Sequence, residues 1–165
     1  MTRNEIALRD ALVGGGAASV LSTLALMAAG KHENGSVVAP INAVSHWLWG
    51  DRALEQDQAS LKYTVPGYAI HHGSAMMWAA MYSLLHGQRP GARMPARAAG
   101  AAAVTAAAAC FVDFRMTPKR LTPGFEHRLT PQSIALVYAL FAAGLALASI
   151  AMSGEGVPTR STRRY

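Results

Sequence analysis

The sequence predicts an all-α integral membrane protein, a four-helix bundle with a short interfacial or re-entrant helix in its first loop. The chain of 165 residues is 52% hydrophobic and only 15% charged, whereas about 25% of the residues in a typical soluble domain are charged. Mean hydropathy is a modest +0.18 because polar connections separate the apolar runs. Basic residues, which give a net charge of +6, flank these runs, as in proteins anchored at an anionic membrane surface.

Four apolar runs approach the length of about 20 residues that a helix needs to cross the hydrocarbon core. They predict one membrane domain over 1–165, with spans at about 11–29, 63–85, 98–114 and 133–152. We expect the first run to be retained as a span, because it is longer than a signal-peptide core of about 7–15 residues. Glu5 and Asp10 also interrupt the positive charge that would precede such a core.

Small residues predict close packing between the spans. Gly14, Gly15 and Gly16 lie in the first span, and alanines fill most of 101–109 in the third. Small side chains let helix backbones approach closely, which is how spans associate in lipid. This packing suits a monomer in the lipid bilayer, a homo-oligomer or a subunit of a membrane complex.

The long first connection, 30–62, contains a predicted short helix from Pro40 to Trp49. Proline suits the first turn of a helix, and the two tryptophans, Trp47 and Trp49, suit the membrane interface. The residues that would share one face are Ile41, Val44 and Leu48. We expect a surface-lying or re-entrant helix, and an irregular loop with two anchoring tryptophans is the alternative.

The distribution of positive charge predicts the orientation. With the N-terminus inside, eight lysines and arginines lie inside and seven outside. The short second connection carries Arg89, Arg93 and Arg97 without an acid, whereas the first carries four acids. The positive-inside rule therefore places both termini in the cytoplasm of a bacterium, with a multi-pass protein in its inner membrane. Nucleic-acid binding is not expected, because it needs a basic patch on a soluble surface.

The second span carries two adjacent histidines, His71 and His72, at about 12–14 Å from its start at 1.5 Å per residue. An ionisable residue at that depth should face the bundle or a wet cavity and have a partner. Asp113 lies at the edge of the neighbouring third span. The polar site that this predicts consists of His71, Ser74, Trp78, Tyr82 and Asp113. We expect His71 to reach Asp113 directly or through one water.

Metal binding is the alternative use of these residues, because imidazole and carboxylate suit several first-row metals. The candidate ligands are His71, His72, Asp113, His46 and His127, which fall at one end of the predicted bundle. We expect no cofactor, and a transition metal is the alternative. A bis-histidine haem is disfavoured because the first, third and fourth spans contain no histidine. Cys110 is the only cysteine, so a cysteine-based zinc site is excluded.

Enzymatic activity is not indicated, although it is left open. Ser74 lies three residues from His71, but the chain has no Gly-x-Ser-x-Gly motif. The sequence favours a non-enzymatic membrane protein, either an accessory subunit or a factor that responds to pH through a histidine. The rival class is a metal-binding or redox membrane protein.

The first half of the chain resembles the YagU-like small bacterial inner-membrane proteins. The shared pattern is a glycine-rich first span, a long connection bearing aromatics, and a span with His-x6-aromatic-Ala-x2-Tyr, here His71, Trp78, Ala79 and Tyr82. The doubled histidine and the alanine-rich third span depart from it. The resemblance implies a multi-span inner-membrane protein with a link to acid tolerance, and it implies no catalytic residues.

Overall fold

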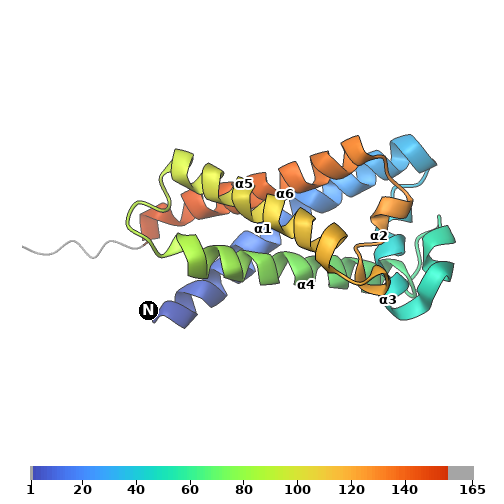
Figure 1. The fold of residues 1–165 in the computed structure, drawn as a ribbon, viewed down its shortest axis with the longest axis horizontal. Coiled ribbons are helices and arrows are strands. Elements are labelled where there is room, and N and C mark those ends of the chain that lie inside the picture. Colours follow the sequence, from blue (N-terminus) through green and yellow to red (C-terminus); the bar gives the residue numbers. More distant parts are fainter. Residues whose placement is uncertain (1, 156–165) are drawn as a thin grey trace, which may run out of the picture.

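The computed structural model describes residues 2–155, and every secondary-structure element in that range is helical, as predicted. The four long helices, which lie along the long axis of the molecule (Figure 1), are α1 (Arg3–Asn34), α4 (Thr64–Tyr82), α5 (Pro95–Phe111) and α6 (Pro131–Ala151). α1 packs on both α6 and α4, and α5 packs on α6, whereas α4 and α5 contact each other little. The predicted orientation also counted arginines at 160, 163 and 164 as inside, and these positions lie outside the residues that the structure describes.

Three helices of the described chain are long and apolar enough to cross a membrane: α1, α6, and α5 with its continuation to Met116. α4, which corresponds to the predicted second span, is not among them. Outward-facing apolar side chains accompany the three candidates. On α5, Val104 and Phe111 are 70% and 59% exposed, while the inner face is a stripe of buried alanines at positions 98, 102, 106 and 109.

Local signals explain where the long helices begin and end. Thr2 and Glu5 form a capping box at the start of α1, which satisfies backbone N–H groups that have no partner in the first turn. Gly35 ends α1 in the left-handed conformation, with φ of 72°, which suits a residue without a Cβ. Prolines occupy the first turn of α5 and α6, at Pro95 and Pro131.

Close approach between helices occurs at particular small residues. A Cβ atom on Gly15 would lie 2.6 Å from Cα of Met76 in α4, and one on Gly144 would lie 2.4 Å from Cα of Ala18. Gly14 would make only ordinary contacts, and Gly16 faces open space. Of the three glycines predicted to pack, Gly15 is therefore the one at which the backbones meet, and Gly144 of α6 joins it.

The predicted helix from Pro40 to Trp49 is divided into α2 (Ala39–Val44) and α3 (His46–Trp49), followed by the 3-10 helix η1 (Gly50–Glu55). Ser45 lies at the break, where its hydroxyl donates a 2.7 Å hydrogen bond to the Asn42 carbonyl. All six residues of α2 are buried, whereas Leu48 in α3 is 58% exposed. α2 is thus folded into the end of the molecule rather than lying on its surface.

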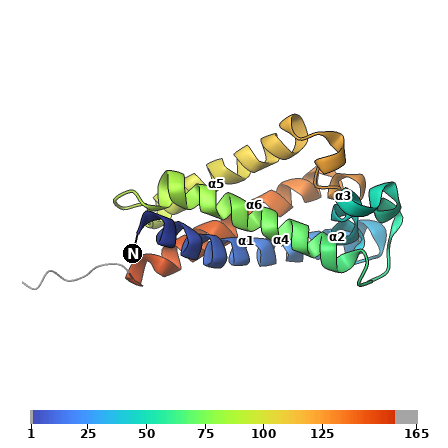
Figure 2. The same cartoon turned by 90° about the horizontal axis from the view of Figure 1, so that it is seen from below.

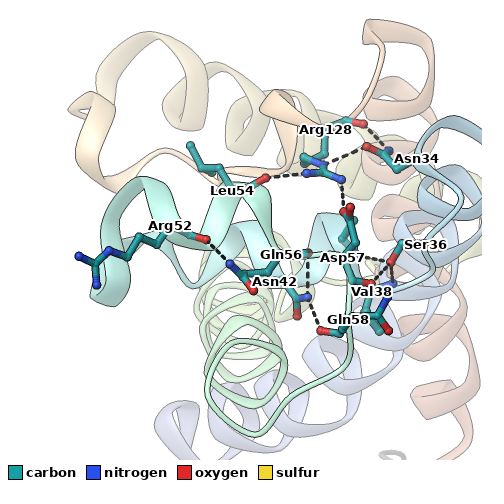
Figure 3. A network of polar contacts seen from close by, with 11 residues as sticks. Asn34, Ser36, Val38, Asn42, Arg52, Leu54, Gln56, Asp57, Gln58 and Arg128 are labelled. Carbon is teal, nitrogen blue, oxygen red and sulfur yellow. Dashed lines mark hydrogen bonds and ion pairs between the residues drawn. The ribbon is translucent and has the colours of Figure 1, made fainter.

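The first and third connections meet at the end that carries α2 and α3, opposite the N-terminus (Figure 1). Arg128 holds them together: its Nε donates to Asn34 Oδ1 at 2.9 Å, its Nη1 donates to the Leu54 carbonyl at 2.7 Å, and its Nη2 pairs with Asp57. Figure 3 shows this network beside Asn42, which donates to the carbonyls of Gln56 and Gln58. The loop end is therefore an ordered polar cap.

Candidate functional site

A cavity of about 500 Å³ lies between α4, α5 and α6, next to the loop end. α5 is inclined to α4 in both views (Figures 1 and 2), and the two helices touch little, which leaves space between them. The lining is mainly apolar. Its aromatic members are Trp47, Trp78, Phe125, Tyr138 and Phe141, and its polar groups come from Ser22, His71, Ser74, Asp113, Thr117 and Tyr138.

His71 is held by the first helix. Its Nε2 lies 2.8 Å from the hydroxyl oxygen of Ser22, which is also 2.8 Å from the carbonyl of Ala18. The serine hydroxyl has one proton, so if it donates to Ala18, then Nε2 of His71 is protonated and donates to Ser22. Nδ1 of the ring is then an acceptor, and it makes no hydrogen bond within residues 2–155.

Asp113 belongs to η3 (Val112–Met116), the π-helical continuation of α5. Its Oδ2 accepts a 2.6 Å hydrogen bond from the hydroxyl of Tyr138 in α6, while Oδ1 has no hydrogen-bond partner in the described chain. The electrostatic neighbours of Asp113 are Cys110, Glu126 and Tyr138. A buried tyrosine hydroxyl needs a partner, so this bond fixes both side chains at the cavity wall.

Four of the five predicted polar-site residues, His71, Ser74, Trp78 and Asp113, line this one cavity. No hydrogen bond joins His71 to Asp113 in the part of the chain that the structure describes: Nε2 of His71 is bonded to Ser22, and Oδ2 of Asp113 is bonded to Tyr138. Tyr82 lies elsewhere, beside Asp10 and Ser149 around a space of only about 10 Å³.

The two partners, Ser22 and Tyr138, were not found from the sequence. A serine in the first span has no spacing that relates it to His71, since the contact joins two different helices. Tyr138 offered a usable signal, because it is the tyrosine of the charge-free fourth predicted span, where a hydroxyl surrounded by lipid would need a partner.

The candidate metal ligands are not brought together as a set. His72 stacks on Tyr68, with ring centroids 5.6 Å apart, as adjacent positions of a helix point in different directions. His46 Nδ1 lies 3.0 Å from the Ala43 carbonyl, and His127 lies 3.9 Å from Glu126. Across residues 2–155, no three His, Cys, Asp or Glu side chains form a group that could hold a metal ion.

A further polar cluster lies at the opposite end, around the buried carboxylate of Asp10, which Arg93 and Ser83 contact. Comparison with known proteins adds no functional residues to the cavity or to the cluster around Asp10. The chain matches no protein-family model, no curated protein and no solved structure.

Proposed function

We propose that this chain is a non-enzymatic, four-span protein of the bacterial inner membrane that responds to pH through the cavity between α4 and α5. The observation that carries the proposal is that a histidine and an aspartate, His71 and Asp113, line one largely apolar cavity with a single protein hydrogen bond each. The YagU-like resemblance at His71, Trp78, Ala79 and Tyr82 agrees with such a role.

Chain geometry supports a crossing by α4, although its composition alone does not mark it as a span. The end of α1 lies beside the third connection, because Asn34 is hydrogen bonded to Arg128. The start of α5 lies at the opposite end, where Arg93 pairs with Asp10 near the start of α1. α4 links these two ends, so it traverses the same thickness as α1, α5 and α6. The orientation with cytoplasmic termini follows from the basic second connection.

The pH response follows from the cost of charge in an apolar site. Within the cavity region, His71 has His72 as its titratable neighbour, and Asp113 has Cys110, Glu126 and Tyr138. A charge that lacks a partner in such a place is costly. A change in protonation of either residue therefore alters the balance of forces between α4, which carries His71, and η3, which carries Asp113. α4 and α5 contact each other little, so few packing contacts oppose a movement of one helix relative to the other.

Catalysis and metal binding receive less support. His71 is bonded to Ser22 rather than to the nearby Ser74. The hydroxyl of Ser22 is fully buried and also lies 2.8 Å from the Ala18 carbonyl, so this serine is held against its own helix rather than presented as a nucleophile. The metal-binding alternative would need a ligand cluster, and the five candidate residues do not form one. An accessory role would use the exposed apolar face of α5, around Val104 and Phe111.

Tryptophan fluorescence tests the pH response. Trp47 and Trp78 line the cavity and Trp49 does not, so a Trp49→Phe background in lipid nanodiscs retains two reporters at the site. We expect a reversible emission change between about pH 8 and pH 3, the range that covers the ordinary pKa values of histidine and aspartate. His71→Gln and Asp113→Asn should each remove or displace it, while His127→Gln, at an exposed position outside the cavity, should leave it unchanged. A flat profile, or one that neither cavity variant alters, contradicts the proposal.

A further inference from the structure

We propose that the cavity between α4, α5 and α6 binds an uncharged, lipid-soluble, planar ring compound that carries carbonyl or hydroxyl oxygens, the chemistry of quinones and phenols. The inference rests on the membrane location in the proposed function, because such a ligand enters from the bilayer. It does not require the pH response, and it includes no electron-transfer step.

The size and lining of the cavity suit this class of ligand. Its volume of about 500 Å³ lies within the range of about 300–1,000 Å³ that is usual for small-molecule sites. Five aromatic side chains contribute to the lining. Aromatic rings pack against a planar ring in offset or edge-to-face arrangements, and this favours a ring compound over a flexible acyl chain.

Three polar atoms at the cavity have unused hydrogen-bonding capacity. In the described part of the chain, Nδ1 of His71, the hydroxyl of Ser74 and Oδ1 of Asp113 make no hydrogen bond to protein. Sites for small ligands typically combine apolar walls with a few polar groups that fix orientation. Ser74 and His71 together supply a donor and an acceptor, which matches a carbonyl or hydroxyl oxygen on a ring. A saturated acyl chain would leave these groups without a partner.

The cavity opens beside α4 at positions where no other helix packs against it. Met77 is 53% exposed although it lines the cavity, and Gly73 leaves a gap because a Cβ there would meet nothing within 4 Å. A side chain at position 73 would therefore occupy the opening without striking the backbone of another helix. Gly100 of α5 has the same open surroundings and does not line the cavity, so it provides a matched control.

The test measures quenching of tryptophan fluorescence by decylubiquinone at pH 7.5, with the full chain carrying Trp49→Phe in phosphatidylcholine nanodiscs. We expect saturable quenching, because Trp47 and Trp78 line the cavity. Gly73→Phe should weaken binding at least tenfold, and Gly100→Phe should change it less than twofold. Ser74→Ala removes a hydroxyl that the protein itself does not use, so it should weaken binding about fivefold while leaving the fold intact.

Three results would overturn the inference. Quenching that rises linearly and is equal in Gly73→Phe and Gly100→Phe indicates partition into the bilayer. Displacement of the probe by oleate at equal concentration identifies an acyl-chain site. Normal binding in Gly73→Phe places the probe elsewhere. Saturable, Gly73-dependent binding without any pH transition would uphold the inference while removing the proposed pH response, whereas a pH transition without binding would do the reverse.

Discussion

The Nη2 atom of Arg93 lies 3.1 Å from both carboxylate oxygens of Asp10, although 83 residues separate them in the chain. Asp10 is only 4% exposed and also accepts a 2.7 Å hydrogen bond from the Ser83 hydroxyl. A second nitrogen of Arg93, Nη1, lies 3.4 Å from the Ser149 carbonyl. The guanidinium thus joins α1 to α6, and Asp10 links both to Ser83, directly after α4, at the N-terminal end of the molecule.

The first prediction concerns this pair. Asp10→Asn leaves the guanidinium without its counter-charge, so it should lower the free energy of unfolding in detergent by about 3–5 kcal/mol. Arg93→Met should have a smaller effect, because Arg9, whose Nη2 lies 3.3 Å from Asp10 Oδ1, still pairs with the carboxylate. The double variant should lose less than the sum, since the two residues act on one interaction. Arg89→Met, at an exposed position in the same connection, is the control and should change stability little. Additive losses would mean that the pair is not coupled.

The second prediction concerns Arg128. Arg128→Ala removes hydrogen bonds to Asn34 and Leu54 and the ion pair with Asp57. Hydrogen exchange of the backbone over 50–58 should accelerate roughly tenfold, as expected when hydrogen bonds of about 1 kcal/mol each are lost. Arg128→Lys should restore little, because one ammonium cannot reproduce the planar fork.

The control for Arg128 is Arg120→Ala, since Arg120 is exposed in the same connection. Its exchange profile over 50–58 should match that of the wild type. Equal exchange in the two alanine variants would show that the polar cap does not depend on Arg128.

The helices were predictable where their cause is local. The apolar runs and Pro40 act within a few residues, and they located the four long helices and the start of the loop-end helix. The break at Ser45 depends on how α2 is buried at the end of the molecule, so a helical pattern through Trp49 could not reveal it. Asp10 and Arg93 were interpreted as flanking charges for the same reason: a pair between distant segments leaves no periodic signal.

The candidate site was predictable in part. Depth in an apolar span is a local property, and it identified His71 as a residue that must face the interior. The identity of its partner is not local. In the described chain, His71 is bonded to Ser22 and Asp113 to Tyr138, and both residues line one cavity without a hydrogen bond between them. These partners lie on different helices, so only helix packing determines them.

The third prediction compares two adjacent glycines. Gly15→Ala should destabilise the protein by about 1–3 kcal/mol, because its Cβ would lie 2.6 Å from the backbone of Met76. Gly16→Ala should be neutral or stabilising by up to about 1 kcal/mol, since its Cβ meets nothing within 4 Å and alanine favours helix. Thermal unfolding in detergent measures both. Equal melting temperatures for the two variants would mean that α1 and α4 do not pack as closely as described.

The last prediction concerns the membrane crossing of α4, which separates a four-span from a three-span protein. Reporters fused after Glu55 and after Met116 should give the same, periplasmic, response, because Arg128 ties the first connection to the third through Leu54 and Asp57. A reporter after Arg97 should report the cytoplasm, because the Asp10–Arg93 pair holds that connection beside the start of α1. If α4 did not cross, Glu55 and Arg97 would lie on one side and Met116 on the other. That pattern would separate Arg128 from its partners by the thickness of the bilayer, and it would contradict both the proposed topology and the packing of the loop end.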